Sequence, residues 1–270
     1  MDQSTLKIFA LLLVLLLLIG CGESLRTYPA DALLAKETMY DADGTLQKTT
    51  QYRYDADGNC IERLERSETR TVKYLYTYDD HGNRLQCEQY VNDDSAPTTR
   101  TCWEYDAQGR VRVQTVFGNH VAVYEYTDGL CCIYVYGHDG NVQGALQCVA
   151  TRVLDAQGRT LEEASYAAED GATLAQQPYE RVTFAYDDEH GGRISAGSVL
   201  RDGESYERQY AYEAISDHTE QHIVYKVSRA SKSEESRTTL TYDENGNLLQ
   251  RTVINHNTGD EYRVDYEYYE

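Results

Sequence analysis

The sequence predicts an all-β protein, an array of consecutive antiparallel hairpins that form a long twisted or curled sheet, either open or partly closed. Three observations favour this fold class. A turn motif of the form Y-D-x-x-G recurs along the 270 residues, tyrosines alternate ahead of it, and turn-rich stretches of a second kind separate the copies. Such recurrence is typical of repeat proteins. The copies begin at Tyr40, Tyr54, Tyr78, Tyr105, Leu154, Tyr186 and Tyr242.

Each position of the motif has a physical reason. The Asp side chain accepts hydrogen bonds from its own turn, two unconstrained residues form a type I turn, and Gly takes the left-handed conformation of a bulge. A weaker copy begins at Tyr136, and residues 212–222 hold a decayed one. The predicted turn residues are Asp41, Gly44, Asp55, Gly58, Asp79, Gly82, Asp106, Gly109, Asp155, Gly158, Asp187, Asp243 and Gly246.

The segments beside the motif alternate as strands do. In "YLYTY", Tyr74, Tyr76 and Tyr78 share one face, with Leu75 and Thr77 on the other. The D-x-x-G turns are expected along one edge of the sheet and the variable turns along the other, joining about sixteen strands. The variable turns lie at 66–69, 91–97, 167–173, 201–205, 231–236 and 255–260.

The ends and the centre of the sheet have their own signals. Residues 29–37, "PADALLAKE", indicate a short helix, and the stretch 129–137 is apolar on both faces, which favours the middle of the sheet. The last strand alternates Tyr262, Val264 and Tyr266 with charged residues. That pattern protects an edge strand from pairing. The predicted β domain covers 39–270.

The N-terminus indicates export. Residues 1–20 hold an apolar run of signal-peptide length. The run ends in "LIGC", which resembles a bacterial lipobox, so cleavage is expected after Gly20 and lipidation on Cys21, followed by a linker to residue 38. A short uncleaved anchor is the alternative, because the charged region before the run is weak. Two or three acyl chains together anchor a protein stably in a membrane. The lipid bilayer is therefore the expected partner of Cys21, on the extracytoplasmic face of the cell membrane.

The recurrent "YDxxGN/R" motif resembles the RHS or YD repeat of bacterial surface proteins and animal teneurins, over residues 40–249. The resemblance implies a β-shell that can enclose a C-terminal toxin. This chain has fewer repeats than such a shell and ends in "YRVDYEYYE". Toxin encapsulation is therefore not expected, and a remnant of a longer toxin-delivery protein is an alternative.

The net charge and the aromatic content limit the classes of partner that the protein is expected to bind. The chain has 45 acidic and 25 basic residues, a net charge of −20, which disfavours nucleic-acid binding because phosphate recognition needs a basic surface. It has 25 Tyr but only 3 Phe and one Trp, Trp103. The tyrosines form either cross-strand ladders or exposed rows that stack and hydrogen-bond sugars.

Six cysteines remain besides Cys21, an even number that suits disulfides in an oxidising compartment. Cys87 and Cys102 are equidistant from the centre of the 91–97 turn, which predicts a disulfide between them. Cys148 is expected near Cys131 or Cys132, and Cys60 has no evident partner. Zinc is not expected, because the sequence lacks a C-x-x-C pair.

Reaction chemistry has little support. "HTEQH" at 218–222 lacks the Glu directly after the first His that a zincin needs. The stretch at Asp55 resembles half of a calcium loop, but Gly comes at the fourth position and no closing Glu follows, so a self-capping turn is favoured. No metal or cofactor is expected.

The sequence therefore predicts a membrane-anchored surface lipoprotein that acts as a binding or structural module and not as an enzyme. Its expected partner is a cell-surface polysaccharide or an envelope or host protein. An extracytoplasmic glycoside hydrolase is the alternative, since the many carboxylates allow a catalytic pair.

Overall fold

The computed structural model describes residues 32–138, 143–169, 173–188, 191–201, 203–228 and 231–269. The signal segment 1–20, Cys21 and the linker up to residue 31 lie outside these ranges. No helix within them is long and apolar enough to cross a membrane. The strands are β1 (Leu34–Asp41), β2 (Leu46–Tyr54), β3 (Cys60–Ser67), β4 (Thr71–Tyr78), β5 (Arg84–Val91), β6 (Thr99–Tyr105), β7 (Val111–Val116), β8 (His120–Thr127), β9 (Leu130–His138), β10 (Gln143–Leu154), β11 (Thr160–Glu169), β12 (Thr173–Leu174), β13 (Glu180–Asp187), β14 (Arg193–Arg201), β15 (Glu204–Ser216), β16 (Thr219–Val227), β17 (Lys232–Tyr242), β18 (Leu248–Asn255) and β19 (Asp260–Tyr268).

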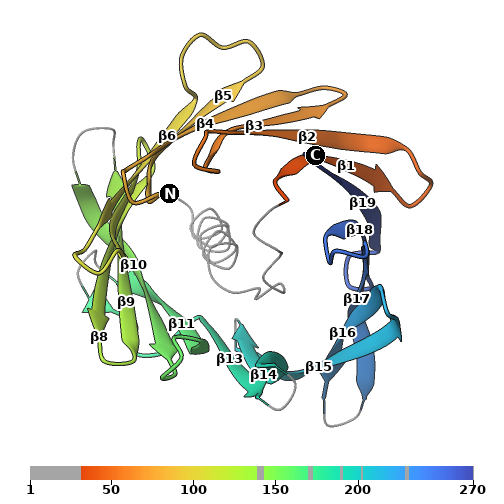
Figure 1. Cartoon of the computed structure of the whole chain (residues 1–270). Coiled ribbons are helices and arrows are strands. Elements are labelled where there is room, and N and C mark those ends of the chain that lie inside the picture. Colours follow the sequence, from red (N-terminus) through yellow and green to blue (C-terminus); the bar gives the residue numbers. More distant parts are fainter. Residues whose placement is uncertain are drawn as a thin grey trace.

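The all-β prediction is confirmed, but the sheet is closed. β12 pairs only with the end of β11, and the other 18 strands form one antiparallel ring in chain order (Figure 1). The ring closes between β1 and β19, where Thr38 lies opposite Asp265 and Tyr40 opposite Arg263. The prediction that 260–268 is an edge strand is therefore wrong. This segment, β19, pairs with β18 on one side and with β1 on the other.

The predicted helix over 29–37 is also wrong for the part that the structure describes. Residues from Leu34 onward form β1, and Glu37 pairs with Tyr266 on one side and with Thr50 on the other. Pairing on both sides outweighs the weak helical preference of this segment.

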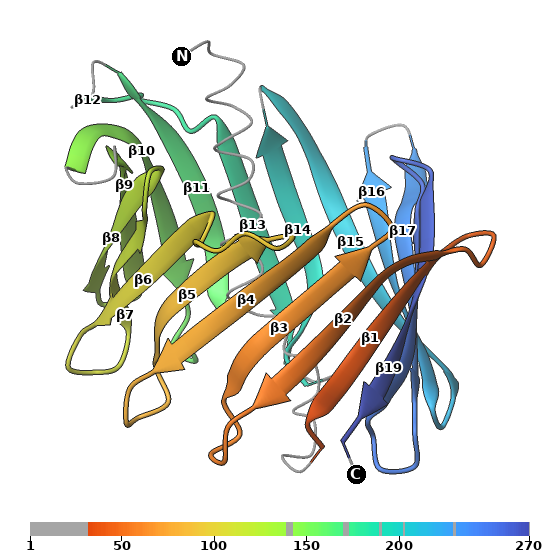
Figure 2. The ribbon, with the colours of Figure 1, turned by 90° about the horizontal axis from the view of Figure 1, so that it is seen from above.

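Because the strands alternate in direction, their connections fall on two rims (Figure 2). The motif rim carries the connections after β2, β4, β6, β8, β10, β13, β15 and β17, and so the D-x-x-G turns of Asp55, Asp79, Asp106, Asp155, Asp187 and Asp243. The variable rim carries the remaining connections. The turn of Asp41 and Gly44, between β1 and β2, lies on the variable rim, so the expectation that all copies share one edge is wrong for the first copy.

The predicted turn geometry is confirmed at every predicted turn Asp except Asp187, whose carbonyl accepts Gly192 N at 2.8 Å, five residues on instead of three. Gly58 N donates to the Asp55 carbonyl at 3.3 Å, and Asp55 N donates to the Asn59 carbonyl at 3.0 Å. The glycine φ angles lie between 75° and 86° at Gly44, Gly58, Gly82, Gly109, Gly158 and Gly246. A register shift follows the turn, because Tyr54 faces Cys60 while Arg53 faces Glu62.

One face of the ring carries most of the motif tyrosines, and its residues are the more buried. Val72 lies on the same face of β4 as Tyr78, and Leu240 on the same face of β17 as Tyr242. Val72 is 6% exposed and Leu240 is 2% exposed. Side chains on the concave side of a closed ring converge and shield one another. We therefore assign this tyrosine face to the interior and call it the inner face.

The outer face carries ion pairs, as expected of a surface in contact with solvent. Lys36 contacts Glu267 at 2.6 Å, and Arg53 contacts Glu62 at 3.1 Å. These side chains occupy the positions that alternate with the inner-face residues.

Candidate functional site

The motif aspartates are occupied by their own turns. One carboxylate oxygen of Asp55 accepts the amides of Asp57 and Asn59 at 3.0 and 2.8 Å, and the other accepts the Asn59 side-chain amide at 3.0 Å. These bonds, with the Asn59 side chain foremost, lower the pKa of Asp55. Among the described residues no group of three or more His, Cys, Asp or Glu is placed to hold a metal ion. The backbone bonds recur at Asp79, Asp106, Asp155 and Asp243.

The strand-end tyrosines hold the bulges closed. The Tyr78 hydroxyl donates to the Cys60 carbonyl at 2.7 Å, and Cys60 is the residue that faces Tyr54 at the register shift. A bulge residue leaves the strand ladder, and its carbonyl needs another partner. Each hydroxyl thus joins one hairpin to the previous one. The same bond joins Tyr105 to Arg84, Tyr126 to Val111, Tyr186 to Thr160, Tyr212 to Ile194 and Tyr268 to Leu248.

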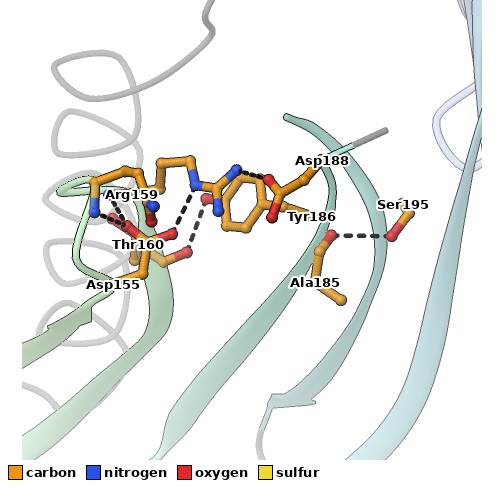
Figure 3. Close-up of polar contacts among 8 residues, drawn as sticks. Asp155, Arg159, Thr160, Ala185, Tyr186, Asp188 and Ser195 are labelled. Carbon is orange, nitrogen blue, oxygen red and sulfur yellow. Dashed lines mark hydrogen bonds and ion pairs between the residues drawn. The ribbon is translucent and has the colours of Figure 1, made fainter. Parts of the chain in front are cut away.

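Arginine adds a further contact in the copy that begins at Leu154 (Figure 3). Arg159 donates to the Asp155 carboxylate at 2.6 Å and also contacts Asp188. Its guanidinium lies 4.5 Å from the centre of the Tyr186 ring. The repeated residues in this copy are engaged with one another, which assigns them a structural role.

One copy breaks this pattern. Tyr242 donates to the Glu220 side chain at 2.8 Å instead of to a carbonyl. Arg193 contacts the other Glu220 oxygen at 3.0 Å, and His222 lies 3.3 Å from the first. Arg193 also lies 4.8 Å from the centre of the Tyr212 ring.

The Glu220 cluster has a defined charge. Burial opposes ionisation of Glu220, but the Tyr242 hydrogen bond and the charges of His222 and Arg193 outweigh it, so the pKa of Glu220 is lowered. An ionised carboxylate with these partners ties β14, β16 and β17 together and is poorly suited to act as a general acid. Glu220 and His222 belong to the "HTEQH" stretch and lie on β16. Nothing in the local sequence pointed to Arg193 or Tyr242 as partners.

A different arrangement covers the inner face of β3 to β6. The rings of Tyr74 and Tyr76 are nearly parallel, at 8°, with centres 6.5 Å apart. The Arg63 guanidinium lies 4.2 Å from the centre of the Tyr74 ring. Arg84 lies 4.5 Å from the Tyr76 ring and 5.8 Å from the Trp103 ring. We call these five residues the aromatic patch.

The aromatic patch is partly open to solvent. Tyr74, Tyr76 and Trp103 are half-buried, and Arg84 is exposed. Burial raises the pKa of Tyr76, so this hydroxyl remains a hydrogen-bond donor at neutral pH. The patch therefore offers ring faces and donors together. The sequence predicted tyrosine rows from alternation, but it did not bring Trp103 and the two arginines together.

The predicted disulfide between Cys87 and Cys102 is absent. Cys102 faces Gln86, while Cys87 faces Thr101. Because successive strand residues point to opposite faces, the two thiols lie on opposite sides of the sheet. Cys148 faces Val135, and neither Cys131 nor Cys132. None of the six cysteines in the described ranges forms a disulfide, and burial raises the pKa of Cys148 to about 11.

The fold and the contacts define a closed antiparallel barrel of hairpins joined by tyrosine hydroxyls. No protein family and no curated protein sequence matches the chain. Among solved structures it is similar to a porin-like protein from Bacteroides vulgatus, with 12% identity, a TM-score of 0.40 and coverage of 88% of this chain and 99% of that one.

A porin-like protein from Bacteroides uniformis gives 12% identity, a TM-score of 0.33 and coverage of 90% and 99%. The TcdB2-TccC3-Cdc42 structure gives 11% identity and a TM-score of 0.33, over 83% of this chain and 16% of that one. Similarity at this level does not place the chain in a family.

Proposed function

We propose that the protein is a lipid-anchored extracytoplasmic binding module whose aromatic patch takes carbohydrate, and that it is not an enzyme. The observation that carries this proposal is the patch itself: three half-buried rings and two guanidinium groups on one face of four neighbouring strands.

The chemistry of the patch suits a sugar. Aromatic rings with a polar edge bind ligands that are apolar on one side and hydroxylated at the rim. Tyr and Trp also lose little conformational freedom on binding, because each has only two side-chain torsions. Arg63 and Arg84 lie against Tyr74 and Tyr76 and so support the orientation of both rings. The motif residues, by contrast, are already engaged in the scaffold.

The anchor is proposed from the sequence. "LIGC" at 18–21 is the lipobox-like segment, and Cys21 is the residue that receives the lipid. Metabolic labelling with a palmitate analogue tests this in the wild type and in Cys21→Ala. We expect label only in the wild type. Label that survives the substitution contradicts the anchor.

A glycan array with the purified protein tests the binding function. We expect discrete glycan signals that Trp103→Ala removes. Tyr90→Ala is the matched control, since Tyr90 is an aromatic residue of β5 that faces Lys73 on the outer face. Flat signals on every glycan contradict carbohydrate binding, and turnover of chromogenic glycosides by the protein contradicts a purely binding role.

A further inference from the structure

We propose that the ligand of the aromatic patch is an anionic carbohydrate, one that carries carboxylate or sulfate groups. This inference rests on the proposed carbohydrate-binding function and names its ligand class. It follows from the charges around the patch, which are opposite in sign to the charge of the whole protein.

The patch has more cations than anions. Arg63 contacts Glu65 at 3.0 Å, and Lys48 approaches the same carboxylate at 3.7 Å. Glu65 therefore serves two cations. Arg84 contacts the rings of Tyr76 and Trp103, and no carboxylate in the described residues lies within ion-pair distance of it. Within ion-pair distance these three cations have one carboxylate in the described ranges, that of Glu65, and the next inner-face carboxylate, Glu37, lies against Tyr52. The net charge of the whole protein is −20.

Some hydrogen-bond donors of the two arginines in the patch also lack acceptors in the described part of the chain. The Arg63 Nε atom is buried and has no hydrogen-bond acceptor among the described residues. A buried donor without an acceptor is costly and is normally satisfied by a partner. Arg84 is exposed and keeps the planar fork of donors that matches carboxylate and sulfate oxygens. A ligand that brings anionic oxygens supplies the partner that Arg84 lacks, whereas Arg63 already pairs with Glu65.

The aromatic rings decide between an inorganic anion and an anionic sugar. Arg63 and Arg84 lie over ring faces, so an anion bound to either guanidinium sits beside an aromatic surface. A sugar carboxylate can bind the arginine while its ring stacks on Trp103 or Tyr76. A bare phosphate or sulfate gains only the first contact. The arrangement therefore favours an acidic sugar unit.

Fluorescence of Trp103 provides the readout, because it is the one Trp of the chain. The full chain in detergent micelles is titrated with tetragalacturonic acid, with its methyl ester, with a neutral galactose tetramer and with sodium sulfate. The acid and its ester match closely in shape but differ in charge. We expect the acid to bind at least about tenfold more tightly than the ester, because a single hydrogen bond to a charged group can contribute that much affinity.

Variants locate the effect. Arg84→Gln is expected to abolish the preference for the acid over its ester, and Arg84→Lys to retain part of it. Lys73→Gln removes a cation that covers Tyr90 on the outer face and is expected to change nothing. Circular dichroism of each variant verifies the fold.

The outcomes separate the two proposals. Equal binding of acid and ester, or an unchanged preference in Arg84→Gln, overturns the anionic ligand while carbohydrate binding stands. Sodium sulfate that binds as tightly as the acid overturns the sugar component. If no oligosaccharide binds and the glycan array is flat, the proposed function itself fails.

Discussion

The arginines in two sections of the inner face have different partners. In the aromatic patch, Arg84 lies on aromatic rings and is exposed to solvent. In the section from β10 to β17 arginines meet carboxylates, and we call this the paired section. Its pairs are Arg152 with Glu163, Arg193 with Glu220, Arg201 with Glu180, and Arg208 with Glu235.

The difference follows from burial. The side chains of Glu180 and Glu235 are only 6% and 9% exposed, and a buried charge must be paired. Arg208 meets Glu235 with two bonds of 2.7 and 3.0 Å. The same hairpin scaffold thus pairs its arginines with buried carboxylates in one section and leaves Arg84 without a carboxylate partner among the described residues in the other.

The largest expected effect is in the paired section. Glu235→Ala leaves Arg208 and Asn257 without the carboxylate to which both donate. We expect a loss of about 3 kcal/mol in the free energy of unfolding, measured by urea denaturation. Glu62→Ala breaks the exposed pair with Arg53 and is expected to cost less than about 1 kcal/mol. Equal losses from both variants contradict the distinction drawn between the pairs.

The Glu220 cluster gives a pH-dependent effect. Because the pKa of Glu220 is lowered in the fold, its stabilisation is present above its unfolded pKa, near 4.3, and is lost as the pH falls through its folded pKa. We expect Glu220→Gln to cost about 1 to 2 kcal/mol at pH 7. The difference from the wild type should shrink near pH 3. A pH-independent difference, from denaturation at both pH values, contradicts the charged state of Glu220.

The tyrosine hydroxyls give a smaller effect. Tyr78→Phe removes the bond to the Cys60 carbonyl and is expected to cost about 1 kcal/mol at any pH. Tyr242→Phe removes the bond to Glu220, so its cost should decline in acid. Denaturation of both variants across the pH range tests the contrast, which fails if the two curves are parallel.

A small effect on stability is also expected from the cysteines. The double variant Cys87→Ser and Cys102→Ser should change the free energy of unfolding by less than about 1 kcal/mol, because no bond joins the two thiols. Mass spectrometry after thiol labelling of the unfolded, unreduced protein should find both cysteines alkylated. A mass that lacks both labels indicates a disulfide and contradicts the register of β5 and β6.

Local features were predictable from the sequence, and long-range pairing was not. The turn at Asp55 and Gly58 and the alternation around Tyr76 depend on a few neighbouring residues. Closure depends on pairing 34–41 with 260–268, segments at opposite ends of the chain that carry no local signal for each other. The disulfide prediction failed by one residue of register, which is enough to move a side chain to the other face. The aromatic patch combines residues from four strands, so predicting it also required the register of those strands.

The most direct measurement compares Arg84→Gln with Arg208→Gln by urea denaturation. Both variants remove one inner-face guanidinium that lies near a tyrosine ring. The structure predicts a loss of about 2 to 3 kcal/mol for Arg208→Gln, which removes the cation paired with buried Glu235, and less than about 0.5 kcal/mol for Arg84→Gln. Equal losses, or a larger loss for Arg84→Gln, contradict the division of the inner face into a paired section and a section where Arg84 has no carboxylate partner within the described ranges.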